Sequence, residues 1–294
     1  MALRSAGVVG RLHRLIWVWL AMAVAALAPK EARAQGWPLS GDGTPFTLTG
    51  TLGVDSVSAF RGVKSTKLNP SVFGAVELER GDVFAGVFTN PTSIAGEVRP
   101  LAVTYVGYSP RVGKFDLGAG ARYYAFIASS DFSFDLDDDG VIDHTGKKGF
   151  SEVFASVSRN VGALNFRARA FYAPNVFAET GGALYLNGRV KAPLGAGFDI
   201  QGDFGVSEFE REQFNDEYID YGVSVYKSVR GFDLYLRYSN TTGLAGTDDR
   251  LVAFGIERSW SFSPEADRRE RMRRKILNRD WSGDKALFGF PATY

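Results

Sequence analysis

The feature that most constrains this chain is an alternation of apolar and polar side chains that repeats from Phe46 to Phe262. Each segment is about ten residues long and ends in turn residues, and a period of two places successive side chains on opposite faces of a strand. No long helical pattern interrupts the series. We expect twelve strands, at 46–60, 70–80, 82–90, 99–108, 114–125, 151–159, 163–173, 183–191, 198–207, 217–228, 231–239 and 250–262.

The connections between these segments alternate in length. Those after the even-numbered segments are short, whereas those after the odd-numbered ones are longer, up to 126–149. Outer-membrane barrels combine short periplasmic turns with longer outer loops in this way, although a soluble sandwich also has one apolar face per strand. Aromatic residues near strand ends are typical of interfacial girdles: Tyr105, Tyr108, Tyr123, Tyr124, Tyr172, Tyr221, Tyr238 and Trp260.

These patterns predict an all-β fold, a transmembrane antiparallel up-and-down β-barrel over residues 35–262. Twelve strands is the preferred count and ten the alternative. The last segment ends on the aromatic Phe262, as final strands of such barrels do. Arg258 interrupts its apolar face, and we expect that side chain to reach toward the interface.

Both ends of the chain differ from the barrel. Residues 1–34 have three arginines before an apolar run at 15–27, and then the sequence Ala32-Arg33-Ala34, which predicts a cleaved signal peptide and export to the outer membrane. The apolar run is shorter than the roughly 20 residues of a spanning helix, although an uncleaved anchor is the alternative. Residues 263–294 are rich in arginine and predict a basic periplasmic tail, with a short amphipathic helix as one option.

Composition excludes several classes of protein. The chain has no cysteine, which rules out a disulfide scaffold and a thiolate metal site. Its net charge of +1 argues against nucleic-acid binding. We expect outer-membrane lipids and small solutes as partners, and the oligomeric state is left open.

The first strands resemble those of a known family. Ser56-Val57-Ser58-Ala59-Phe60-Arg61-Gly62, then Pro70, matches the opening Ser-x-Tyr-x-Phe-Arg-Gly of the TorF-type porin family, with Ser58 in place of the tyrosine. Residues 81–90 are similar to its second motif, with Phe88 in place of tryptophan, and 101–108 to the strand after that motif. The resemblance implies a channel-like barrel of undefined substrate and no catalytic site.

The polar faces of the strands supply candidate lumenal charges. Ten acidic and seven basic residues lie on them, a weak excess that favours cations, and the bases of 163–173 and 183–191 are expected to form one positive strip. The predicted pore-lining residues are Glu77, Glu79, Asp116, Arg122, Arg167, Arg169, Arg189, Lys191, Asp199, Asp203, Asp233 and Arg237.

Three functions are compatible with this interpretation. The preferred one is a porin for passive diffusion of small hydrophilic solutes or ions. The alternative is a closed structural or adhesive barrel, since twelve strands leave less room than the 16 to 18 or so of water-filled porins. A hydrolase is disfavoured because His144, in a loop, is the one histidine outside the signal sequence, and a nucleophilic site needs a histidine base.

The longest loop carries an acidic motif, Asp-x-Asp-x-Asp-Gly-x-x-Asp, from Asp135 to Asp143. Alternate carboxylates converge on one hard cation in EF-hand-type loops, where a glycine permits the turn. The usual glutamate at position twelve is replaced by Gly146, and a solvated acidic loop is the alternative. We expect Ca²⁺ to stiffen the loop through Asp135, Asp137, Asp139, Val141 and Asp143.

Overall fold

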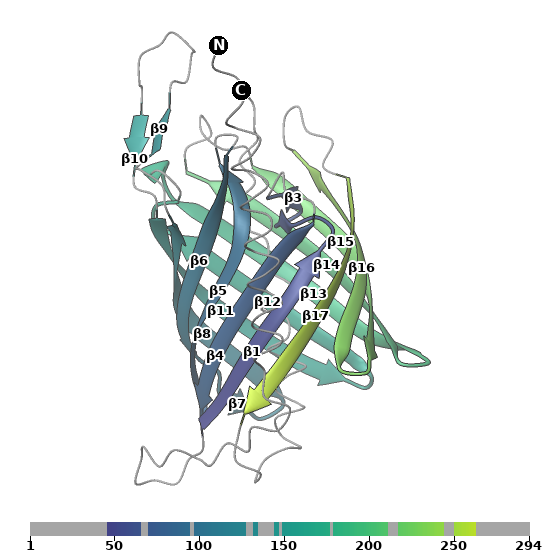
Figure 1. The fold of residues 1–294 in the computed structure, drawn as a ribbon. Helices are drawn as coiled ribbons and strands as arrows, with labels where there is room; N and C mark the ends of the chain where they lie inside the picture. The colour runs from purple at the N-terminus through teal and green to yellow at the C-terminus, as the bar shows by residue number, and fades with distance from the viewer. Residues whose placement is uncertain are drawn as a thin grey trace.

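A computed structural model describes residues 46–65, 70–94, 97–127, 132–134, 144–146, 149–176, 179–210, 217–243 and 250–262. Its described elements are strands, and twelve long ones form the wall of a barrel (Figure 1). They are β1 (Phe46–Asp55), β4 (Ser71–Arg80), β5 (Val83–Ile94), β6 (Glu97–Tyr108), β8 (Phe115–Phe126), β11 (Gly149–Val161), β12 (Leu164–Ala173), β13 (Ala183–Gly195), β14 (Phe198–Phe209), β15 (Tyr218–Val229), β16 (Phe232–Thr242) and β17 (Leu251–Phe262).

The sheet closes on itself. Each strand pairs antiparallel with its neighbour in sequence, and β1 pairs with β17 from Leu48 opposite Phe262 to Asp55 opposite Gly255. Closure leaves no free edge in the wall, which a membrane-spanning sheet requires because lipid offers no hydrogen bonds. The predicted fold and the count of twelve strands are therefore confirmed.

The two ends of the barrel differ. Short turns join the strands at one end, around 81–82, 109–114, 162–163, 196–197 and 230–231; we call it the short-turn rim, and β7 (Arg111–Val112) lies there. The other end, the loop rim, carries two small hairpins, β2 (Ala59–Phe60) with β3 (Val63–Lys64) and β9 (Phe132–Phe134) with β10 (His144–Gly146).

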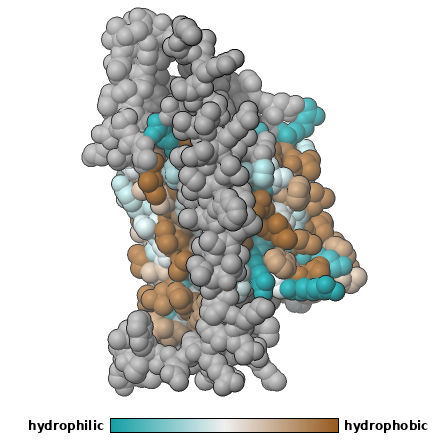
Figure 2. Space-filling view, in the orientation of Figure 1, coloured by the Kyte–Doolittle hydropathy of each residue, from teal (hydrophilic) through white to brown (hydrophobic). Residues whose placement is uncertain are grey.

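The strands expose their apolar side chains outward. On β12, Leu164, Phe166 and Tyr172 are exposed, whereas Arg169 and Phe171 between them are buried. Brown, hydrophobic residues cover much of the visible wall in Figure 2. An apolar exterior around a polar interior is the arrangement of a transmembrane barrel. Among the described residues there is no helix long and apolar enough to cross a membrane.

Three details predicted from the sequence are wrong. The connection after the third strand is not a longer loop, because β5 and β6 stay paired up to Ile94 opposite Glu97. Pro91 and Pro100 are accommodated in this pairing because they lie directly opposite each other, so both missing donors fall at one place in the ladder. Tyr105 and Tyr124 belong to no outer girdle, because both face the lumen, where Tyr124 is 1% exposed and Tyr105 donates to Glu77.

The third error concerns the first strand. It was expected to continue to residue 60, but β1 ends at Asp55 and the chain leaves the wall. Residues 56–65, which include β2 and β3, form what we call the lumenal hairpin. The residues that carry the family resemblance, Ser56 to Gly62, are therefore part of this hairpin and not of a spanning strand.

Candidate functional site

The lumenal hairpin turns at Arg61 and Gly62. Both have left-handed backbone conformations, with φ of 47° and 84°, and Gly62 meets that demand without strain. A side chain at position 62 would also collide with Asp220 and Thr241, so the tip lies against β15 and β16. The tip thus fits closely against the barrel wall.

The stem of the hairpin is fixed to the opposite part of the wall. The amide of Ser65 donates to the carbonyl of Ser58 across the stem at 2.9 Å. Thr92 Oγ1 of β5 donates to the Ser65 carbonyl at 2.9 Å, and Asn90 Nδ2 donates to Ser58 Oγ at 3.5 Å. All four residues are buried.

Phe60 anchors the hairpin in an apolar cluster inside the barrel. It is 3% exposed and belongs to a buried cluster with residues of β6, β8, β11, β12, β13 and the β12–β13 connection: Leu101, Val103, Tyr124, Phe126, Phe150, Ala173, Val176 and Ala183. Burying a side chain of this size contributes about 1.5–3 kcal/mol. The hairpin is therefore held by apolar packing as well as by hydrogen bonds.

Arg61 extends from the tip across the lumen to β11. Its guanidinium lies 2.5 Å from the Glu152 carboxylate and 4.2 Å from the centre of the Tyr185 ring. Burial acts to lower the pKa of Arg61, but the Glu152 carboxylate, together with Tyr124, Tyr218 and Tyr185, outweighs it, and the pKa lies above its usual value. Arg61 is thus a fixed positive charge inside the barrel, and Glu152 also accepts from Tyr124 at 3.0 Å.

Four further arginines surround this contact; with Arg61 they form what we call the arginine cluster: Arg61, Arg122, Arg169, Arg189 and Arg237. The ring of Phe171 lies within 4.4–5.5 Å of three of their guanidinium groups, those of Arg61, Arg122 and Arg169. Cations over an aromatic face gain from its quadrupole, most strongly where water is excluded.

Carboxylates compensate part of this charge. Arg189 Nε donates to Asp203 Oδ1 at 2.7 Å, and Gln201 Nε2 donates to Asp203 Oδ2 at 3.0 Å. Arg237 lies near Asp203 and Asp220. Against five arginines the cluster holds three carboxylates, those of Glu152, Asp203 and Asp220, and 5 − 3 leaves a net charge of +2.

The hairpin and the cluster leave little free space between them. The cavity they enclose has a volume of about 20 Å³, room for a single water molecule. Phe60, Arg61 and Phe171 line it together with Tyr185, Arg189 and other residues of the cluster. We call this level the constriction.

The predicted pore-lining residues all occupy lumenal positions in the strands, alternating with exposed apolar ones. Five of them belong to the constriction: Arg122, Arg169, Arg189, Asp203 and Arg237. The others line the rest of the lumen, and the predicted strip is present in the register, with Arg167 opposite Arg189 and Asn165 opposite Lys191. Its charge is shared with acids of β14, since Lys191 Nζ lies 3.1 Å from Asp199.

The lumenal charges are unequally distributed around the wall. The adjoining strands β4, β1, β17 and β16 carry the acids Glu77, Glu79, Asp55, Glu257 and Asp233. The adjoining strands β12 and β13 carry the bases Arg167, Arg169, Arg189 and Lys191. A solute in the lumen therefore lies between an acidic wall and a basic one.

The aromatic residues of the constriction, Phe171 and Tyr185, were missed as site residues. A signal for them exists in the lumenal glycines. A side chain at Gly205 would collide with Tyr185 and Asp220, and one at Gly120 would collide with Phe154. A glycine across from an aromatic residue in neighbouring strands makes room for an inward ring.

Other predicted features lie outside the described residues. These are the signal peptide, the tail and all five calcium ligands, Asp135, Asp137, Asp139, Val141 and Asp143. The flanking strands β9 and β10 pair with Phe134 opposite His144. The calcium site stays a prediction.

The closed wall, its apolar exterior and its charged interior define the class: an outer-membrane-type β-barrel. The chain belongs to a family described as bacterial proteins of unknown function (Gcw_chp), whose model matches residues 40–263. That description names no porin type, so the TorF-type resemblance stays a prediction. No curated protein matches the chain.

Several solved porins have a similar arrangement of strands. The KdgM porin has a TM-score of 0.48 at 9% identity, covering 74% of this chain and 99% of its own. The NanC porin has 0.45 at 11% identity, covering 72% and 98%. OpdK of Pseudomonas aeruginosa has 0.36 at 12% identity, covering 74% and 67%. Similarity at this level carries no function over to this chain, whose own residues have to support any functional conclusion.

Proposed function

We propose that the chain is an outer-membrane porin for small hydrophilic solutes, with the short-turn rim in the periplasm. The observation that carries the proposal is the charged, segregated lumen, because a barrel with a purely structural role has no need of opposed acidic and basic walls. A transverse field of this kind orients and filters solutes in channels.

The constriction favours anions. The excess of acidic residues over the whole lumen predicted a weak cation preference. Selectivity, however, is decided where the path is narrowest, and there the net charge is +2. A fixed positive charge on Arg61 and its neighbours attracts anions and repels cations. We therefore propose small anions as the preferred solutes.

Single-channel recording in planar bilayers tests this proposal. The native chain is compared with a variant in which residues 57–64 are replaced by a short Gly-Ser linker. We expect small, anion-selective steps from the native chain and steps several-fold larger from the variant. Removal of the hairpin deletes Arg61 and opens the constriction, so the reversal potential is expected to move toward the cation side.

The control is an equal amount of each protein shown to be folded by its heat-dependent mobility in gels. If both folded proteins are silent in the bilayer, the porin proposal is wrong. Cation selectivity of the native chain would contradict the proposed role of the arginine cluster while leaving a channel in place.

The small enclosed volume at the constriction, about 20 Å³, favours a second candidate function. In this alternative the barrel is closed and serves a structural or adhesive role through its loop rim. A silent native chain together with a conducting hairpin variant would support it. The predicted calcium-stiffened outer loop is compatible with both candidate functions.

A further inference from the structure

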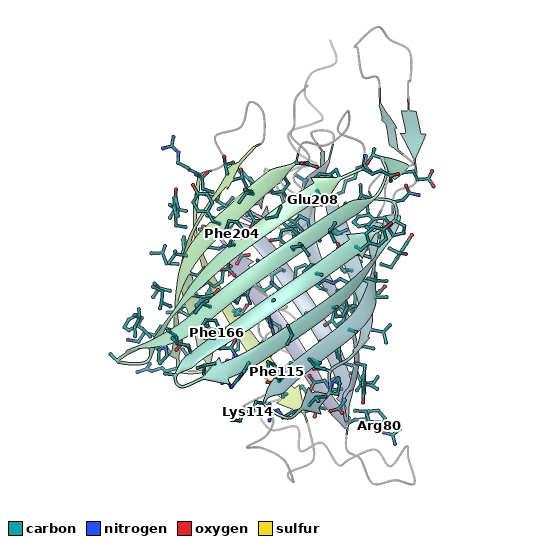
Figure 3. All side chains as sticks on the ribbon, turned by 180° about the vertical axis from the view of Figure 1, so that it is seen from behind. Arg80, Lys114, Phe115, Phe166, Phe204 and Glu208 are labelled. Carbon is teal, nitrogen blue, oxygen red and sulfur yellow. The ribbon has the colours of Figure 1, made fainter. Side chains whose placement is uncertain are left out.

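The outward face of the barrel carries few charges, and they are segregated by end. Among the outward positions of the twelve long strands whose side chains the structure describes, the charged residues are Arg80, Arg159, Lys227, Arg258 and Glu208. The four cations lie toward the short-turn rim, whereas Glu208 lies at the other end. Arg80 and Glu208 mark these two ends in Figure 3.

Each of these cations lies over a phenylalanine that begins a neighbouring strand. Arg80 lies over Phe46 at 5.2 Å, Arg159 over Phe115 at 5.3 Å, Lys227 over Phe198 at 4.0 Å and Arg258 over Phe232 at 5.1 Å. In the first three pairs the two residues are direct cross-strand partners. The stacked rings hold the cations against the wall at the level where a bilayer has its headgroups.

One of the four cations also borders a groove. A hollow of about 710 Å³ opens on the outer wall and is lined by residues of β8 and β11 to β15, including Arg159 and Phe115. Its floor is low because Ala168, Gly188 and Gly202 have small or no side chains, and a Cβ added at either glycine would meet nothing within 4 Å. Phe166 and Phe204 also line it, and Figure 3 shows both on the outer face.

Arg159 is available for a ligand at the rim of this groove. Its contact within the described part of the chain is the Phe115 ring, and its Nε is buried there without a hydrogen-bond partner. No carboxylate lies at an outward strand position near it, since the described outward acid is Glu208. A guanidinium beside an apolar groove matches an amphiphile with an anionic head and a hydrocarbon tail.

We propose that this groove is a binding site for one glycerophospholipid, with its phosphate at Arg159 and an acyl chain lying over Gly188 and Gly202. The groove starts at the short-turn rim, at Phe115, and extends toward Phe204, as an acyl chain extends from its headgroup into the membrane. The proposal rests on the membrane placement of the barrel but not on channel activity, so a silent bilayer recording would leave it standing.

Native mass spectrometry of the full chain in detergent micelles with added dioleoylphosphatidylglycerol tests the site. We expect one lipid retained per barrel. Arg159→Gln removes the charge that binds the phosphate, and Gly188→Leu fills the groove without a clash inside the barrel. Arg159→Gln is expected to lower the apparent lipid affinity about tenfold, as the loss of one charge-assisted contact does. Gly188→Leu is expected to lower it by about the same factor, because the added side chain occupies the space of the acyl chain.

Two matched variants serve as controls. Arg258→Gln removes a cation stacked on aromatic rings at the same rim but away from the groove, and Gly50→Leu adds an outward side chain on β1, where space is also open. Both are expected to retain lipid within about twofold of the native chain. An excess of inorganic phosphate is expected not to displace the lipid.

Three results would overturn the proposal. Equal loss in Arg159→Gln and Arg258→Gln would mean that the rim attracts lipid by charge alone. Unchanged retention in Gly188→Leu would mean that the groove holds no acyl chain. A dimer that Gly188→Leu disrupts, in place of a bound lipid, would identify the occupant as a second copy of the chain.

Discussion

The lumen uses the same kind of ion pair at two depths, with different consequences. At the constriction the side chains of Arg61 and Glu152 are 7% and 2% exposed, and those of Arg189 and Asp203 are 3% and 4% exposed. Toward the short-turn rim the side chains of Lys191 and Asp199 are 21% and 43% exposed.

The difference shows which part of the lumen is structural. Buried charges have lost their hydration and depend on one another, so they are fixed in position. Exposed pairs are screened and contribute little to stability, about 0–1 kcal/mol, but they leave a wetted, charged surface. We conclude that the constriction holds the hairpin in place, whereas the lumen near the short-turn rim presents charge to solutes.

The sharpest test of this contrast is Glu152→Gln. It leaves Arg61 and Arg122 buried without the carboxylate they face, so we expect the free energy of unfolding to fall by about 3–5 kcal/mol. Urea unfolding in detergent micelles, followed by tryptophan fluorescence, measures the change. The double variant with Arg61→Gln is expected to recover part of the loss, since it removes both charges. A loss under about 1 kcal/mol in the single variant would contradict a buried, coupled pair.

A smaller effect on stability is expected at Gly205, a lumenal glycine that leaves room for the side chains beside the arginine cluster. Gly205→Ala places a methyl group against the Tyr185 hydroxyl and the Asp220 carboxylate, and we expect it to cost about 1–3 kcal/mol in the same unfolding assay. Gly202→Ala is the control, because it lies on the same strand but on the open outer face. We expect it to change stability by less than about 0.5 kcal/mol. Equal effects of the two substitutions would show that the glycines do not make room for the ring.

The smallest change is expected for the exposed pair. Asp199→Asn removes the carboxylate that faces Lys191, and we expect it to lower the free energy of unfolding by less than about 1 kcal/mol, with a smaller change still at high salt. The unfolding assay at low and high ionic strength measures this. A loss as large as that of Glu152→Gln would remove the distinction between the two depths.

Much of the barrel could be predicted from the sequence because a period of two is a local signal. Each strand shows which residues face lipid, and the charges Arg122, Arg189 and Asp203 follow from that alternation. The hairpin was missed although a local signal exists, because the phase of the alternation reverses after Asp55. Val57 and Ala59 are apolar at the odd positions that hold polar or small residues in β1, and Ser56 and Ser58 stand at the even positions that hold its apolar ones. Tyrosine, by contrast, suits an interfacial girdle and a packed lumen equally, so Tyr105 and Tyr124 were assigned to the wrong face.

The contacts that hold the lumenal hairpin inside the barrel also affect the order of folding. Arg61 and Glu152 are 91 residues apart, and the tip contacts β15 and β16, which come later still. The hairpin precedes in sequence the strands that hold it. Its contacts with β11, β15 and β16 can therefore form only after these strands have joined the sheet. Contacts of such high sequence separation form late in folding. Every newly made molecule is therefore expected to pass through a moment in which its wall is complete and its interior is still unobstructed.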